Sequence, residues 1–157
     1  MHINGILFRI LAKITKYMFN TSISVETLNS MSKGTMIEHL DIEFTEIQAG
    51  FIKAKMPVDH RTIQPMGLLH GGASVVLAET LGSTAVVLAL KDPLKETGVG
   101  VEINANHLKS ARNGFVIGTC VPLRIGRTIH VYEIKIHDED ENLICASRLT
   151  VAIIAVR

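Results

Sequence analysis

The sequence predicts an α+β domain in which one long helix is wrapped by a curved antiparallel sheet of about six strands. Two observations predict this fold class. Residues 70–90 form an apolar run whose single charged residue is Glu79, which is typical of a helix buried on nearly all sides. Six shorter segments, two before this run and four after it, alternate apolar with polar residues, as strands with one buried face do. We therefore expect the strands to surround the helix.

Composition and charge narrow the function classes. The chain has 157 residues, of which 47% are hydrophobic and 20% charged, as in a single globular domain. A net charge of +1 argues against a nucleic-acid surface, which needs a clearly basic balance. Cys120 and Cys145 are too few for a disulfide framework and suit a reducing cytoplasm. The seven histidines show neither HxxxH nor HExxH spacing, so no metal site is predicted.

Residues 1–22 are predicted to form an amphipathic helical extension, followed by the main domain over residues 23–157. Apolar residues recur there every three or four positions, and Arg9, Lys13 and Lys16 lie on the other side. These basic residues interrupt the apolar stretch that a signal peptide needs. The helix either packs on its own domain or dimer mate, which we favour, or contacts a membrane surface or a partner. Ser24 is expected to be the N-cap of a second, short helix over residues 25–31.

The strands follow from the alternating segments. Residues 40–45 and 52–58 are predicted to form a hairpin around the turn at 48–50, and Pro57 marks the end of its second strand or a sheet edge. Four more strands are predicted over residues 99–105, 115–123, 128–137 and 143–154. Asn113-Gly114 indicates a tight hairpin turn, and the acidic run 138–142 a solvated turn.

The apolar helix is long enough to span a bilayer, but Glu79 and the hydroxyl residues along it favour a buried core helix. Small residues along it would let a curved sheet approach closely: Gly72, Ala73, Ala78, Gly82 and Ala85. A lone acid in an apolar wall needs a chemical reason. Glu79 is therefore a candidate catalytic carboxylate, the alternative being a structural acid paired with a Lys or Arg.

Four segments carry a resemblance to a known family. They are residues 56–59 (MPVD), 61–72 (RTIQPMGLLHGG), 77–83 (LAETLGS) and 101–107 (VEINANH). The chain resembles the hotdog-fold acyl-CoA thioesterases over residues 25–154, and is most similar to the bacterial group that includes the 1,4-dihydroxy-2-naphthoyl-CoA thioesterase of menaquinone biosynthesis. The resemblance implies a cytoplasmic hydrolase that needs no cofactor, with CoA as part of its substrate. It also implies a homodimer that forms the active sites and often pairs into a homotetramer.

The resemblance assigns roles that the chemistry of these residues fits. Gly71 and Gly72 open the helix, where free backbone N–H groups face outward, so a thioester oxygen fits there. By similarity, the Gly71 N–H is the oxyanion donor, and His70 and Gln64 orient or polarise the same carbonyl. The alternatives are a hydrogen-bonded interface residue for His70 and a turn-stabilising residue for Gln64.

Glu79 is predicted to act either as a general base on water or as a nucleophile. Ser83, one turn later, is placed to hold the carboxylate or its water. Gly71 and Glu79 lie eight residues apart on one helix, about 12 Å, which is too far to act on one carbonyl. They must therefore come from different protomers of a twofold dimer.

Substrate-binding residues are predicted with less specific signals. Ser110, Arg112, Arg127 and Thr128 match segments where family members hold the CoA nucleotide, although each is as well explained as a solvated turn residue. His107 either lines the acyl or pantetheine channel or is a packed histidine. The apolar residues predicted to line a pocket for an aromatic or a medium-chain acyl group are Met66, Leu68, Val86 and Val87.

Two other functions remain open at this stage. A hydroxyacyl thioester dehydratase shares the fold and also places a His and an acid across a dimer interface, but the segment at residues 64–72 favours the hydrolase. A non-enzymatic acyl-CoA-binding protein would use the amino-terminal helix as its effector. Release of free thiol from an acyl-CoA distinguishes the hydrolase from both.

Overall fold

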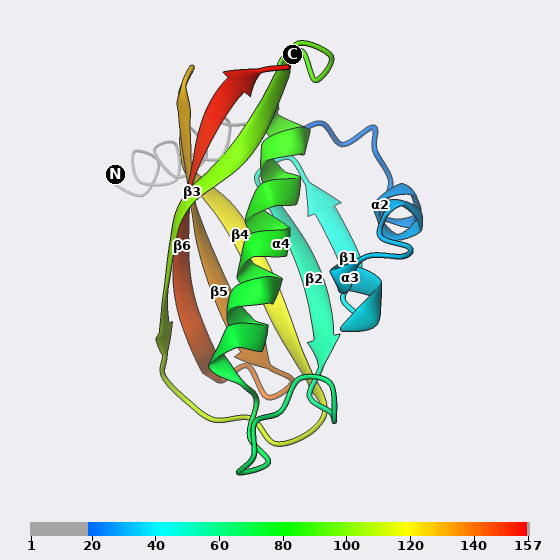
Figure 1. Cartoon of the computed structure of the whole chain (residues 1–157), viewed down its shortest axis with the longest axis vertical. Helices are drawn as coiled ribbons and strands as arrows, with labels where there is room; N and C mark the ends of the chain where they lie inside the picture. Colours follow the sequence, from blue (N-terminus) through cyan, green and yellow to red (C-terminus); the bar gives the residue numbers. More distant parts are fainter. Residues whose placement is uncertain (1–18, 157) are drawn as a thin grey trace, which may run out of the picture.

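The computed structural model describes residues 19–156, which form a six-stranded antiparallel sheet curved around one long helix (Figure 1). The predicted fold class is confirmed. The strand order is β1-β2-β4-β5-β6-β3. The strands are β1 (Glu43–Gln48), β2 (Phe51–Pro57), β3 (Glu96–His107), β4 (Phe115–Ile125), β5 (Ile129–Asp138) and β6 (Leu143–Ala155), and the helices are α2 (Val25–Met31), α3 (Met36–His39) and α4 (Gly71–Ala89).

The core lies between α4 and the concave face of the sheet. Leu77, Ala78 and Leu81 of the helix are fully buried. The helix can approach the sheet closely at Gly82 because this residue has no side chain. A Cβ there would collide with the Leu149 side chain of β6. Although α4 has the length and hydropathy of a membrane span, the strands wrap it as they wrap a core helix (Figure 1).

The first strand begins later than the alternating pattern predicts. Residues 36–39 form α3, whose N-cap Thr35 accepts a hydrogen bond from the Ile37 N–H at 3.2 Å. Asp41 then adopts a positive φ of 55°, and the Ile42 N–H bonds back to the Ile37 carbonyl at 2.9 Å, which closes the helix. Alternation at Leu40 and Ile42 was therefore a wrong indication of strand, because capping residues decide the local structure.

The predicted turn at Asn113-Gly114 is not a hairpin. β3 pairs with β6, and β4 pairs with β2 and β5, so β3 and β4 are not neighbours. Gly114 does adopt a positive φ of 72°, but in a longer connection that crosses the end of the sheet. The remaining strand predictions are confirmed to within a few residues at each end.

The two sheet edges differ. The β1 edge is occupied by Asn29 of α2, whose side-chain amide donates to the Phe44 carbonyl at 3.0 Å and accepts from the Phe44 N–H at 2.9 Å. At Phe44, Asn29 thus makes the two backbone hydrogen bonds that a neighbouring strand would make. At the other edge, β3 has a partner strand on one side only among the described residues. Its register shifts between Gly100 and Glu102, which marks a β-bulge.

The domain includes Phe19, which precedes the predicted boundary at residue 23. Its ring is 3% exposed and lies 6.4 Å from that of the buried Tyr132. Its N–H donates to the Ala49 carbonyl at 2.8 Å. Ser24 caps α2 as expected, accepting from the Thr27 N–H. The amphipathic helix predicted within residues 1–22 lies largely outside the described residues.

Candidate active site

The loop between β2 and α4 is anchored before it reaches the helix. Thr62 is 1% exposed, and its hydroxyl donates to the Pro57 carbonyl at 2.8 Å. Arg61 forms an ion pair with Asp59 and holds the pKa of that carboxyl at about 2, well below its usual range. The His70 N–H donates to the Thr62 carbonyl at 2.8 Å. These contacts fix where the helix begins.

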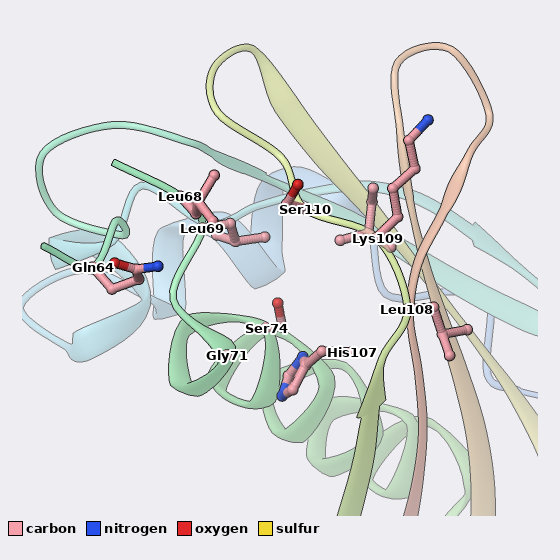
Figure 2. Close-up of a pocket in the computed structure, with 10 residues that line it drawn as sticks. Gln64, Leu68, Leu69, Gly71, Ser74, His107, Leu108, Lys109 and Ser110 are labelled. Carbon is pink, nitrogen blue, oxygen red and sulfur yellow. The ribbon is translucent and has the colours of Figure 1, made fainter. Parts of the chain in front are cut away.

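Residues 64–68 form a tight turn at the edge of the site. The Gln64 N–H donates to the Leu68 carbonyl, and the Gly67 N–H to the Gln64 carbonyl, both at 2.8 Å. Gly67 has a φ of 71°, which favours glycine there. The Gln64 side-chain oxygen accepts from the Met66 N–H. Its amide nitrogen has no acceptor among the described residues and points toward the cavity (Figure 2). Gln64 therefore stabilises the turn and offers a donor at the same time.

His70 is the N-cap of α4. Its Nδ1 accepts a hydrogen bond from the Gly72 N–H at 2.8 Å, which assigns the ring proton to Nε2. The Gly72 N–H is thus already occupied and is not a donor for a ligand. The Gly71 N–H has no acceptor within residues 19–156. The helix start therefore presents two free donors, the Gly71 N–H and the His70 Nε2–H.

A cavity of about 330 Å³ opens beside this helix start (Figure 2). It lies between the 64–69 loop, the first turn of α4, the end of β3 and the segment that follows β3. The lining residues are Gln64, Leu68, Leu69, Gly71, Ser74, His107, Leu108, Lys109, Ser110 and Ile144. Five residues predicted from the sequence thus meet in one place: Gln64, Leu68, Gly71, His107 and Ser110.

His107 lies against the first turn of α4 (Figure 2). A Cβ at Gly71 would be 2.7 Å from the His107 Nε2 atom. A side chain at position 71 would therefore meet the imidazole. Gly71 brings β3 and the helix start together and leaves its backbone open to the cavity.

Glu79 is half-buried two turns further along α4. The Ser83 hydroxyl donates to its Oε1 at 3.2 Å. Within residues 19–156, no Lys, Arg or His forms an ion pair with this carboxylate. Among the described residues, Glu79 is therefore not a structural acid neutralised by a neighbouring cation.

The other predicted residues lie elsewhere. Arg127 lines a second cavity of about 220 Å³ at the carboxyl end of α4, together with Lys91 and the buried His130. Burial lowers the pKa of His130, whose ring lies 3.0 Å from the Tyr132 hydroxyl. Exposed positions outside the first cavity are taken by Met66, Arg112 and Thr128. Within one chain, the residues predicted to bind the nucleotide therefore lie in two places, with Ser110 at the first cavity and Arg127 at the second.

Val86 cannot contact a substrate, because it is 1% exposed and packs against Gly98 of β3. Val87 is 46% exposed and lines an apolar groove of about 240 Å³. Ser83 also lines this groove, which joins it to Glu79. Its walls are Leu28, Met31, Ser32, Ile37, Phe44, Ser83, Thr84 and Val87, none of which is charged.

Sequence reasoning missed five lining residues of the first cavity, of which Ser74 and Lys109 have polar side chains. Ser74 lies one turn after Gly71, on the same side of α4, and is 1% exposed. The helical period was a sufficient signal for it. Lys109 lies two residues after the end of β3 at His107 and also lines the cavity, with its ammonium group pointing away from Gly71 (Figure 2). Its place depends on where β3 ends, which the alternating pattern did not predict. Among the described residues there is no group of three His, Cys, Asp or Glu side chains suited to a metal ion.

Comparison with known proteins agrees with this architecture. Residues 66–145 match the family model described as "Thioesterase superfamily". The 1,4-dihydroxy-2-naphthoyl-CoA hydrolase of Escherichia coli K12 is 53% identical over 132 residues, 84% of this chain and 96% of that protein. The proofreading thioesterase EntH of Cronobacter turicensis is 48% identical over 130 residues, 83% of this chain and 93% of that protein.

Solved structures give the same result. A mutant thioesterase from Pseudomonas aeruginosa superposes with a TM-score of 0.86 at 41% identity, covering 88% of this chain and 99% of that one. A thioesterase from Haemophilus influenzae superposes with a TM-score of 0.84 at 44% identity, covering 88% and 95%. The similarity spans nearly the whole of each solved chain.

Proposed function

Because this chain belongs to the thioesterase superfamily, as the resemblance predicted, and is a thioester hydrolase, we propose that it cleaves an aromatic or medium-chain acyl-CoA to the free acid and CoA. The observation that carries the mechanism is Glu79, an acid on the core helix that has no cationic partner among the described residues and is held by Ser83. It is the group that activates the attack on the thioester carbonyl.

The donors at the helix start stabilise the negative charge that develops on the carbonyl oxygen. In the tetrahedral intermediate the carbonyl oxygen becomes an anion, and the Gly71 N–H and the His70 Nε2–H are free to bind it. The Gln64 side-chain amide is a third donor and lines the same cavity as Gly71, whereas His70 lines a neighbouring cavity with Ala73 and Val76. Collapse of the intermediate expels the CoA thiolate. Glu79 acts either by taking a proton from the attacking water or by attacking the carbonyl itself. In the second case expulsion of the CoA thiolate leaves a mixed anhydride, which water hydrolyses to the free acid, restoring the Glu79 carboxylate.

The active site is proposed to be shared by two protomers. Gly71 and Glu79 belong to one straight helix and lie eight residues apart, about 12 Å, so one protomer cannot place both on the same carbonyl. A twofold pairing of two chains with antiparallel α4 helices brings Glu79 of one to the helix start of the other, twice. The open β3 edge supports this arrangement, and pairs of such dimers would give a homotetramer.

The substrate is proposed from the lining residues. Lys109 and Ser110 at the first cavity, with Arg112 nearby in the chain, offer groups for the CoA phosphates, and Arg127 and Thr128 offer others. The uncharged groove beside Ser83 suits an apolar acyl group, since about 150 Å³ holds one benzene ring. Similarity to the E. coli hydrolase supports 1,4-dihydroxy-2-naphthoyl-CoA, hence menaquinone biosynthesis in the cytoplasm, as the first substrate to test.

The test is a thiol-release assay on aromatic and aliphatic acyl-CoAs, with wild-type protein beside Glu79→Gln. The substitution keeps the shape and removes the ionisable group, so we expect kcat to fall about 10²- to 10⁴-fold. The matched control is Glu133→Gln, at a partly exposed glutamate of β5 that pairs with Lys135, and it should retain wild-type activity. Nearly full activity of Glu79→Gln refutes the mechanism, and no thiol release from any acyl-CoA refutes the function.

A further inference from the structure

β3 approaches the Glu79 carboxylate at Gly100. A Cβ at this position would lie 2.8 Å from the Glu79 Oε1 atom, closer than real Cβ atoms come to any neighbour. The next nearest atoms are the Glu79 Cδ at 3.7 Å and Oε2 at 4.0 Å. The space that a side chain would fill at position 100 is therefore occupied by this carboxylate.

Backbone conformation does not require a glycine there. Gly34, Gly67 and Gly114 adopt positive φ angles, but Gly100 does not, so its backbone suits any residue. Gly98, two residues earlier, has a different reason, because a Cβ there would lie 2.5 Å from Val86 in the core. At Gly100 the atoms nearest to a Cβ, among the described residues, all belong to Glu79.

The contact also constrains the carboxylate. Oε1 accepts from the Ser83 hydroxyl at 3.2 Å and lies where a Cβ at Gly100 would be, so Ser83 of α4 and Gly100 of β3 both adjoin the same oxygen. The β-bulge that follows Gly100 bends β3 at this point, a feature often found next to active sites.

We propose that Gly100 is a positioning residue for Glu79, and that its missing side chain sets where the carboxylate meets the thioester. This inference rests on the proposed function. Gly100→Ala should displace the carboxylate and weaken its bond to Ser83. The fold should survive, because the obstructing atom is the end of a flexible side chain.

A misplacement on the order of 1 Å costs about 10²-fold in rate. We therefore expect Gly100→Ala to lower kcat about 10- to 100-fold while KM changes less than about twofold. The matched control is Gly98→Ala, which should lower the melting temperature through the core contact with Val86 and leave kcat within about twofold of wild type.

The double variant Glu79→Gln/Gly100→Ala separates positioning from other effects. If Gly100 acts through the carboxylate, the double variant should be no slower than Glu79→Gln alone. Equal kcat losses in Gly98→Ala and Gly100→Ala, additive losses in the double variant, or a change of oligomeric state in Gly100→Ala by light scattering would each overturn the inference.

A folding readout covers the case in which Gly100→Ala is insoluble. Glu79→Ala/Gly100→Ala removes the obstructing carboxylate, so it should fold and melt close to Glu79→Ala. If the second substitution still prevents folding, the carboxylate is not the obstacle and the inference is wrong. Failure of the proposed function is distinguishable, because there Glu79→Gln itself retains activity.

Discussion

His70 decides which backbone N–H groups at the start of α4 are bonded within the helix and which are free to bind a ligand. Helices usually begin with a hydroxyl, carboxylate or amide residue, whose oxygen accepts from the first turn. Here the imidazole Nδ1 does so, and the same ring keeps an N–H at Nε2. Capping takes the Gly72 N–H and leaves that of Gly71 free. One residue thus caps the helix and keeps an N–H that we propose as a donor to the oxyanion.

The two roles of His70 can be separated by substitution. His70→Asn keeps an oxygen that caps the helix but loses the Nε2–H, so we expect a melting temperature close to wild type and a kcat lowered about 10²-fold. His70→Ala removes both groups and should also lose about 1 kcal/mol of stability, which is about 2–4 °C in melting temperature. Calorimetry and the thiol-release assay measure the two effects. Full activity of His70→Asn would mean that the ring only caps.

At the scale of elements, α2 protects the sheet. The Asn29 amide satisfies both backbone groups of Phe44 on the edge strand. Unpaired edges are templates for association with other chains, so this side chain protects β1 at Phe44.

Replacing Asn29 tests that protection. Asn29→Ala leaves the N–H and carbonyl of Phe44 without partners, and we expect a loss of about 1–3 kcal/mol in the free energy of unfolding, measured by urea titration. Light scattering should also show more association than in wild type. Ser30→Ala on the exposed side of α2, where the hydroxyl bonds only to the Thr27 carbonyl, is the control. Equal stability of the two variants would contradict this role.

The same scale shows how far the sequence predicts the structure. The long helix and five of the six strands follow from apolar periodicity, because that period reflects burial directly. α3 does not, because Thr35 and Asp41 cap a four-residue helix inside an alternating stretch. The meeting of His107 with Gly71, and of Gly100 with Glu79, depends on how β3 crosses α4, which only the three-dimensional arrangement defines. The one signal for the second contact in the sequence was Gly100 itself, because a glycine inside a strand indicates a bulge or a close approach of another group.

For the whole molecule, the proposed sharing of sites between two protomers can be tested by complementation. In the proposed homodimer, Glu79→Gln and His70→Asn each impair both sites, but a mixed dimer has one site with both wild-type residues. Unfolding and refolding an equal mixture should therefore recover about one quarter of wild-type activity. Native mass spectrometry confirms that mixed dimers form. Mixed dimers without recovered activity would show that each chain supplies a complete site.

The unequal edges of the sheet have a consequence for assembly. If two chains pair through β3, the unpaired backbone groups along both β3 edges become hydrogen-bonded to each other. The outer borders of the joined sheet are then two copies of β1, where Asn29 already occupies both backbone groups of Phe44. A third chain would have to displace Asn29 to pair along the whole of β1, which disfavours further strand addition and fibre growth.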